Sequence, residues 1–212
     1  MFQIKSRSEC QSQCVGILLT GGASKRFGND KLAQRIGDSS VAEMAARSLG
    51  TACERSYEAG NGLTELPQIP GTLGLGPLAA IAQTVSFLRQ RELLDLNQCA
   101  IVLAGDVPFI QPSTLAILNH WPGSASVVPV VDSESQYLAA RWSAESLDKS
   151  KALVSTGVRK IREALVLPST QWVTIEMWDK SCYFEFLDVD TPEDLSRAIE
   201  IRRASIDGKA TG

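Results

Sequence analysis

The chain has 212 residues, of which 44% are hydrophobic and 21% charged, and its formal net charge is −3. This composition and length suit one α/β domain with a substantial core. The low net charge and scattered cations exclude a basic nucleic-acid platform, and apolar runs of at most about six residues are too short to cross a membrane.

Residues 1–14 are polar and lack the apolar stretch of a signal peptide, so we expect a flexible N-terminal arm and a cytoplasmic protein. The chain has an odd number of cysteines and no C-x-x-C motif. We therefore expect free thiols rather than disulfides or a metal site. The cysteines are Cys10, Cys14, Cys53, Cys99 and Cys182.

An apolar run over residues 15–19 predicts a buried strand that leads directly into a glycine-rich loop. Residues 18–31 read L-L-T-G-G-A-S-K-R-F-G-N-D-K. Glycines let backbone approach a ligand closely, and successive N–H groups can form a concave anion site. Lys25, Arg26 and Lys31 add positive charge. Neither G-x-x-x-x-G-K-[ST] nor G-x-G-x-x-G is present, but the loop is still expected to hold a polyphosphate.

Strands and helices alternate along the rest of the chain. We expect further strands near residues 53–57, 100–104, 125–131, 137–141, 172–176 and 183–187. We expect helices near residues 40–49, 77–91, 112–120 and 158–165, with a last helix that opens at Thr191. This order predicts a three-layer α/β sandwich with a mostly parallel sheet. We expect one domain over residues 15–205, followed by a flexible tail over residues 206–212.

An acidic residue, Asp106, follows the apolar strand predicted over residues 100–104. A half-buried carboxylate there needs a partner, and Mg²⁺ is commonly held by one or two carboxylates together with substrate phosphates. An aspartate shortly before Pro108 is equally typical of a turn or a helix cap. The residues alone leave both interpretations open.

A second acidic segment begins at Asp188 and reads D-V-D-T-P-E-D-L. Thr191, followed by a proline and by Asp194 three residues later, predicts the capped start of a helix. Asp188 and Asp190 alternate as in a strand, which would direct both side chains to the same side.

These segments together resemble the nucleotidyltransferases that attach a nucleotide to a phosphorylated small molecule, and among them the molybdenum cofactor guanylyltransferases. The loop of that family typically reads L-A-G-G-x-S-x-R-M-G-x-D-K, so Thr20 and Phe27 replace an alanine and a methionine. The family's D-x-P, G-x-G-P-L-A-G-I and D-x-D-T-P-E-D-L segments are matched in the same order. The resemblance covers about residues 15–195 and implies a Rossmann-like fold of the nucleotide-diphospho-sugar transferase type.

The resemblance also implies a site. Lys31, Arg26 and Asp106 would be catalytic, and Asp106 and Asp190 would hold Mg²⁺, with Mn²⁺ as an alternative; Asp188 is a weaker candidate. The nucleotide would be bound by Leu19, Thr20, Gly21, Gly22, Ser24, Lys31, Gly76, Pro77 and Asp106.

The reaction implied by the resemblance is transfer of GMP from GTP to the phosphate of molybdopterin, with release of pyrophosphate. The Gly21–Gly22 pair favours GTP, because cytidylyl relatives usually have Ala-Gly there. A phosphate monoester is largely dianionic near neutral pH, so the reaction requires no protein base. This agrees with a chain whose single histidine, His120, is expected at a helix end. Proteins that make or accept the molybdenum cofactor are candidate partners.

Three points leave alternatives open. Family members commonly carry an aspartate shortly before G-P-L, whereas residues 69–72 here read I-P-G-T. The second substrate has no motif of its own, and the basic residues that could hold its phosphate could equally form a solvated face: Arg141, Lys151, Arg159, Lys160 and Arg162. The alternatives are a cytidylyltransferase, another small-molecule nucleotidyltransferase, or a non-catalytic binding module with a nucleotide-binding fold.

Overall fold

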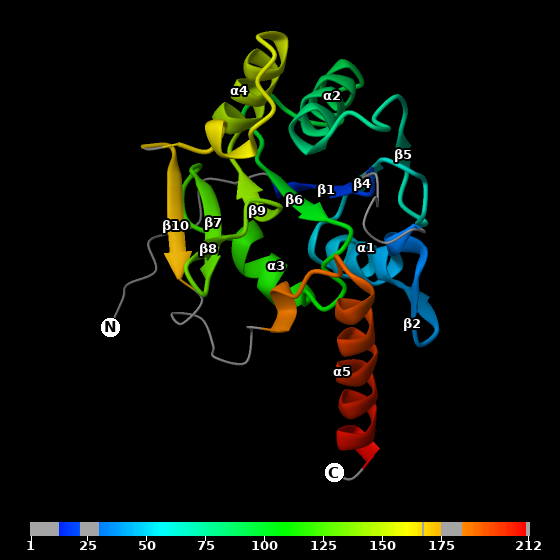
Figure 1. Cartoon of the computed structure of the whole chain (residues 1–212). Helices are drawn as coiled ribbons and strands as arrows, with labels where there is room; N and C mark the ends of the chain where they lie inside the picture. The colour runs from blue at the N-terminus through cyan, green and yellow to red at the C-terminus, as the bar shows by residue number, and fades with distance from the viewer. Residues whose placement is uncertain (1–12, 22–29, 167, 175–183, 211–212) are drawn as a thin grey trace, which may run out of the picture.

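The computed structural model describes residues 13–21, 30–166, 168–174 and 184–210. An eight-stranded sheet runs through its centre in the order β10-β7-β9-β6-β1-β4-β5, and β8 pairs with β7 (Figure 1). The strands are β1 (Val15–Leu19), β4 (Ser56–Ala59), β5 (Gln68–Ile69), β6 (Ala100–Ala104), β7 (Ser126–Val131), β8 (Glu134–Ser135), β9 (Ala139–Trp142) and β10 (Thr170–Thr174).

The pairing within this sheet is mostly parallel. Strand β1 pairs parallel with both β4 and β6, β4 pairs parallel with β5, and β10 pairs parallel with β7. Strand β9 runs antiparallel to β6 and β7, between which it lies. The predicted α/β fold with a mostly parallel sheet is therefore confirmed.

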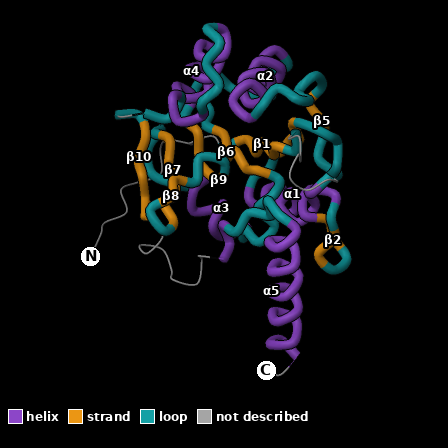
Figure 2. Tube along the Cα trace, in the orientation of Figure 1, coloured by secondary structure: helices purple, strands orange, loops and turns teal. Residues whose placement is uncertain are grey.

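Helices cover both faces of the sheet (Figures 1 and 2). Helices α1 (Val41–Ala52) and α3 (Pro112–Asn119) pack on one face, and α2 (Pro77–Gln90) and α4 (Ala144–Ser155) pack on the other. Helix α5 (Pro192–Ala210) extends away from the body of the molecule. The short elements are the 3₁₀ turns η1 (Lys31–Ala33) and η2 (Ile161–Glu163) and the hairpin β2 (Arg35–Ile36) and β3 (Ser39–Ser40).

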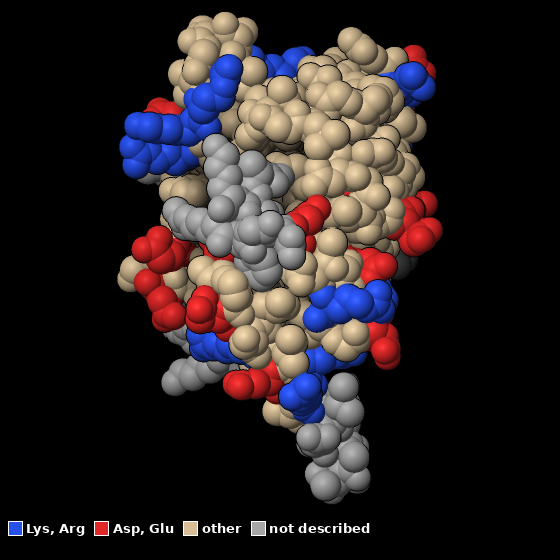
Figure 3. Space-filling view, turned by 45° about the vertical axis from the view of Figure 1, so that its right-hand side comes forward, with Lys and Arg blue, Asp and Glu red and all other residues tan. Residues whose placement is uncertain are grey.

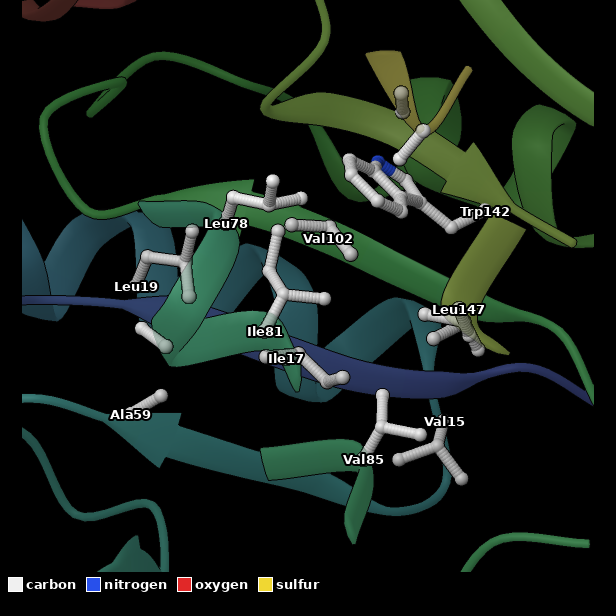
Figure 4. Close-up of a cluster of buried hydrophobic side chains, with 14 of the residues drawn as sticks. Val15, Ile17, Leu19, Ala59, Leu78, Ile81, Val85, Val102, Trp142 and Leu147 are labelled. Atoms are coloured by element: carbon white, nitrogen blue, oxygen red, sulfur yellow. The ribbon is translucent and has the colours of Figure 1, made fainter. Parts of the chain in front are cut away.

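All five residues of β1 are buried, and successive side chains point to opposite faces of the sheet. Leu18 packs into the cluster beneath α1 and α3, whereas Ile17 packs beneath α2. Figure 4 shows Ile17 together with Val102 of β6 and with Ile81 and Val85 of α2. Burial on both faces explains why β1 and β6 read as continuous apolar runs in the sequence.

A third apolar cluster lies beside the carboxyl end of β6. It joins η1, β2, α1, the loop after β6, the segment before α5, and α5 itself through Leu32, Ile36, Val41, Ala42, Phe109, Val189 and Ala198. Three of its members are close in sequence to candidate site residues: Leu32 to Lys31, Phe109 to Asp106, and Val189 to Asp190. Packing within this cluster therefore positions the three charged side chains.

Two helices begin with a capping box. At α1 the Ser40 Oγ accepts from the Glu43 N–H at 3.2 Å, and the Glu43 carboxylate accepts from the Ser40 N–H at 2.6 Å. This backbone hydrogen bond lowers the pKa of Glu43. At α5 Asp194 Oδ2 accepts from the Thr191 N–H at 2.8 Å, and Thr191 Oγ1 accepts from the Asp194 N–H at 3.2 Å. The cap predicted at Thr191 is confirmed.

The prediction of a helix over residues 158–165 is wrong. Only the single turn η2 forms there, and the helix in this region is α4, which lies earlier in the chain. Ser143 starts α4 by accepting a hydrogen bond from the Ser146 N–H, and Gly157, with φ of +85°, follows its end. Many polar residues in α4 hide the apolar period that would predict a helix.

Other boundaries also differ from the prediction. Residues 184–186 form a 3₁₀ turn rather than part of a strand, and β4 lies three residues beyond the predicted start of its strand. Cys14, which falls in the predicted arm, is buried, and helix α5 continues past the predicted domain boundary at residue 205. Within the described part of the chain, no helix combines the length and apolarity needed to span a bilayer.

Gly60 is required by a close approach between the loops after β1 and β4. Its φ is +146°, and a Cβ there would lie 2.3 Å from the Gly21 nitrogen. We expect Gly60→Ala to lower the free energy of unfolding by about 2 kcal/mol or more, measured by urea denaturation.

Gly74→Ala is the matched control. Gly74 also has a positive φ, +71°, but a Cβ there meets nothing within 4 Å, so this variant reports backbone strain alone. Equal losses in the two variants would show that the contact with Gly21 contributes nothing.

Candidate active site

Strands β1, β4 and β6 end at the same edge of the sheet, and the residues that follow them lie close together there. The Gly105 N–H donates to the Leu19 carbonyl at 2.9 Å, and the Thr20 N–H donates to the Ala59 carbonyl at 3.0 Å. These bonds continue the pairing of β1 with β6 and with β4 for one residue beyond the strands. Leu19, Thr20 and Gly21 therefore lie between the ends of β4 and β6, where parallel sheets bind ligands.

Lys31 bridges two carboxylates at this edge. Its Nζ lies 2.7 Å from Asp106 Oδ2 and 2.5 Å from Asp190 Oδ1. The lysine side chain is only 15% exposed. Burial by itself lowers the pKa of Lys31, but Asp106 and Asp190 more than offset this effect, so the pKa is raised. The ammonium is therefore charged at neutral pH.

Lys31 and Asp190 are both held by the backbone around them. Asp30 caps η1 by accepting from the Leu32 N–H at 3.1 Å, and its other oxygen accepts from the Asn61 side-chain amide at 3.3 Å. On the opposite side, the Val189 N–H donates to the Asp106 carbonyl at 2.9 Å. Asp188 and Asp190 were expected to alternate as in a strand, but residues 187–190 form no strand, and this backbone bond ties the segment to the loop after β6.

Asp188 adds a third negative charge close by. Although the residue is exposed overall, partial desolvation of its carboxyl raises its pKa, and the charges of Asp190 and Asp106 raise it further. The three acids therefore repel one another in the absence of a cation, and Lys31 is positioned to offset that repulsion.

A buried carboxylate fixes the residue that directly follows β1. Glu58 of β4 is fully buried and accepts four hydrogen bonds. Two come from the Leu63 and Thr64 N–H groups at 2.8 and 3.0 Å, and two come from the Thr20 and Thr64 hydroxyls at 2.5 and 2.6 Å. Asn61 in turn donates its N–H to the Thr20 hydroxyl at 3.0 Å. This network joins the ends of β1 and β4.

The sequence analysis missed Glu58 and Asn61. The strand that carries Glu58 was predicted to end at residue 57, which placed the acid in a loop. An available signal was Thr20 itself, because it replaces the alanine typical of the resembling family and brings a hydroxyl that must find a partner once buried.

The segment before α2 lies close to Gly21, which follows β1. A Cβ on Gly21 would be 3.5 Å from the Thr72 carbonyl. Gly76, with φ of +75°, caps α2, and Pro77 occupies its first turn, so the matched G-L-G-P-L segment does lie at a helix start. Thr72 is buried close to where the resembling family commonly has an aspartate. Leu73 and Leu75 are exposed here.

Several predicted site residues lie outside the described residues: Gly22, Ser24 and Arg26. Among the candidate basic residues, Arg141 is buried and donates to backbone carbonyls, so it is not available to a substrate. Lys151 and Arg159 line a groove of about 560 Å³ between α2 and α4. His120 caps α3, as expected. On the face in Figure 3, positive and negative side chains are interspersed.

The two bridged aspartates fit a divalent cation. Their oxygens converge on one point, now taken by the Lys31 ammonium, and carboxylate oxygens are what Mg²⁺ and Mn²⁺ prefer. The described residues hold no group of three or more histidine, cysteine or acidic side chains arranged for a metal. Oxygens from a ligand or from water would have to complete the coordination.

We expect Thr20→Val to lower the free energy of unfolding by about 2 kcal/mol. The variant lacks the hydroxyl, so buried Glu58 loses a hydrogen-bond donor and the Asn61 N–H loses its acceptor. Valine keeps the shape of threonine. Thr20→Ser keeps the hydroxyl and loses only a methyl group, so its loss in urea denaturation should be about half or less. Serine as harmful as valine would contradict the proposed role of the network.

We expect Asp188→Asn to stabilise the ligand-free protein at pH 7 by less than about 1 kcal/mol, since the residue is exposed and its interactions are screened. Because the pKa of Asp188 is raised in the folded protein, its protonated form stabilises the folded state relative to its ionised form. This stabilisation is complete below the pKa of the unfolded state and is lost as the pH rises through the pKa of the folded state, so at pH 7 the ionised carboxylate is unfavourable. The gain should therefore fade as the pH falls to about 4. Thermal unfolding at several pH values tests this, and a gain independent of pH would contradict it.

Comparisons with known proteins identify the family to which the chain belongs. A family model described as the MobA-like NTP transferase domain matches residues 16–170. A probable molybdenum cofactor guanylyltransferase of Chloroflexus aggregans is 27% identical over 198 residues, covering 85% of this chain and 90% of that protein. One from Bacillus licheniformis is 26% identical over 199 residues, covering 85% and 94%.

Solved structures share the fold. Molybdopterin-guanine dinucleotide biosynthesis protein A from Archaeoglobus fulgidus superposes with a TM-score of 0.70 at 22% identity, covering 88% of this chain and 97% of that one. A Mycobacterium tuberculosis protein solved in complex with manganese has a TM-score of 0.58 at 17% identity, covering 89% and 99%. Because the family model spans most of the chain, the protein belongs to the MobA-like NTP transferase family, a family of nucleotidyltransferases.

Proposed function

We propose that the protein transfers GMP from GTP to the phosphate of molybdopterin, giving a guanine dinucleotide cofactor and pyrophosphate. The observation that carries the proposal is the Lys31 bridge between Asp106 and Asp190, at the strand ends beside Gly21. The names of the relatives support GTP and molybdopterin as the substrates. The Gly21–Gly22 pair supports the same choice of nucleotide.

The chain's own groups suit a triphosphate. Gly21 has no side chain, and a Cβ there would come within 3.4 Å of the Gly60 Cα, so the loops after β1 and β4 are close together at this point. Lys31 carries its charge on a side chain that can turn from the carboxylates to a phosphate oxygen. Arg26 would add a second cation from the same loop.

Asp106 and Asp190 would hold Mg²⁺, with Mn²⁺ as an alternative. When bound, such an ion neutralises charge on the phosphates as the new bond forms. The manganese complex of the structural neighbour supports a divalent cation in this fold. Asp188 would contribute further negative charge beside the ligands.

No general base is needed for the proposed reaction. The attacking group is a phosphate that is already largely ionised near neutral pH. The raised pKa of Lys31 keeps it charged, so it stabilises negative charge rather than removing a proton. The residues of the site thus act by positioning and electrostatic stabilisation.

The setting of the reaction is part of the proposal. We propose that residues 15–205 act as a single domain in the cytoplasm. Proteins that make or accept the molybdenum cofactor remain the candidate partners, because the product must reach an apoenzyme.

The test is pyrophosphate release with GTP, Mg²⁺ and molybdopterin as substrates. Lys31→Met and Asp106→Asn should each lower turnover by at least about a hundredfold, because each removes a charge needed at the phosphates. Lys149→Met is the matched control, since it removes a lysine of α4 that is not a candidate for either substrate, and it should retain near-normal turnover. Near-normal activity of the Lys31 or Asp106 variant would overturn the assignment of that residue.

Thermal unfolding with GTP, CTP or ATP, each with and without Mg²⁺, identifies the nucleotide, because a ligand that binds only the folded state raises the midpoint. We expect a shift with GTP and Mg²⁺ that Lys31→Met abolishes. A shift with CTP instead would indicate a cytidylyltransferase. No shift with any nucleotide would favour a non-catalytic module.

A further inference from the structure

A buried guanidinium lies at the opposite edge of the sheet from the candidate active site. Arg141 of β9 is only 4% exposed. It donates to the Trp121 carbonyl at 2.5 Å and to the Gly123 carbonyl. No carboxylate of the described residues forms an ion pair with it, and its Nε has no hydrogen-bond partner among them. A buried cation is costly without a counter-charge.

Cys99 is the group placed to supply that counter-charge. Arg141 Nη2 lies 3.4 Å from the Cys99 sulfur. The backbone N–H of Ala144, the first residue of α4, also lowers the pKa of Cys99, and the start of a helix favours negative charge. Cys14 has the largest effect on this thiol, and together with Arg141 and Ala144 it lowers the pKa of Cys99 despite burial.

Cys14 lies beside Cys99 on the neighbouring strand. In the parallel pairing of β1 with β6, Val15 lies opposite Ala100, which places the residues just before them, Cys14 and Cys99, side by side. Both belong to the apolar cluster beneath α1 and α3. Paired strands lie about 4.8 Å apart, within the range of Cα separations that a disulfide spans.

Among the described residues, Cys53 and Glu145 are further titratable groups in this region. Cys53 lies near Cys14, and burial raises its pKa to about 12, so it stays a neutral thiol. Cys14 keeps its proton as well, because its hydrogen bond to Cys99 raises its pKa. The Glu145 carboxylate accepts from the Ser169 hydroxyl at 2.5 Å.

A cavity lies close to Cys99, although the thiol itself is buried and is not part of its lining. It has a volume of about 500 Å³, and its lining includes Ser124, Ala144 and Glu145. The Ser124 carbonyl lies 3.7 Å from the Cys99 sulfur. Ser124 therefore belongs both to the wall of the cavity and to the surroundings of the thiol.

We propose that Cys99 is a reactive thiolate paired with Arg141, which reduces small peroxides such as hydrogen peroxide and then forms a disulfide with Cys14. The thiolate attacks one peroxide oxygen, the O–O bond breaks, and the sulfur becomes a sulfenic acid while the other oxygen leaves as hydroxide. Cys14 then attacks this sulfur, the S–O bond breaks, and water leaves with the proton of Cys14. The sulfurs lose two electrons, which the peroxide accepts.

Alkylation kinetics test the thiolate. The protein carries Cys10→Ser and Cys182→Ser, both outside the described residues, and is pulsed with iodoacetamide at pH 5.5 to 9 before unfolding and peptide mapping. At pH 7 we expect Cys99 to react at least about tenfold faster than Cys53, with a rate that is half-maximal at a pH clearly below the ordinary thiol pKa of about 8.5. Cys53 is an internal control, because it is also buried and no cation of the described residues affects its pKa. Labelling of Cys99 no faster than Cys53, or a midpoint above pH 8, would overturn the proposal.

Hydrogen peroxide tests the disulfide. Peptide mapping without reduction should find Cys14 linked to Cys99. In a Cys14→Ala variant, dimedone should trap the sulfenic acid on Cys99, whereas the matched Cys53→Ala variant should still form the disulfide. Circular dichroism checks that each variant is folded. Thiols that remain free after peroxide, or a disulfide that uses Cys53, would refute the assignment.

Discussion

The candidate active site depends on holding two negatively charged side chains, Asp106 and Asp190, close together. Asp106 and Asp190 would separate if each were free to move, because two carboxylates repel at short range. The Val189–Asp106 backbone hydrogen bond and the apolar contacts of Val189, Phe109 and Leu32 prevent this. The Lys31 ammonium supplies the charge that makes the arrangement tolerable, so packing and electrostatics act here as one unit.

Much of this could be predicted from the sequence where a residue's role follows from its neighbours along the chain. The buried strands β1 and β6, the cap at Thr191 and the position of Asp106 after a strand are local patterns of this kind. Helix α4 was missed because its stability comes from one apolar face against α2 and not from its polar sequence. Glu58 was missed because its four donors come from three separate residues that only the fold brings together.

The two edges of the sheet use buried charge differently. Glu58 is a buried side chain whose two oxygens accept four hydrogen bonds, so its role is to fix the backbone around it. Arg141 is a buried cation that donates to backbone carbonyls and forms no ion pair with a carboxylate of the described residues. In the arrangement proposed above, the Cys99 thiolate supplies the counter-charge.

The position of Lys31 also bears on the order in which ligands bind. Its ammonium lies between the two carboxylates, so in the proposed function a divalent cation competes with a group attached to the protein at high local concentration. If Lys31 left the carboxylates, its ammonium would lose two ion pairs, and a phosphate oxygen could replace them. The site is thereby biased against binding a bare metal ion and toward taking up the ion together with a nucleotide, which couples two binding events through one side chain.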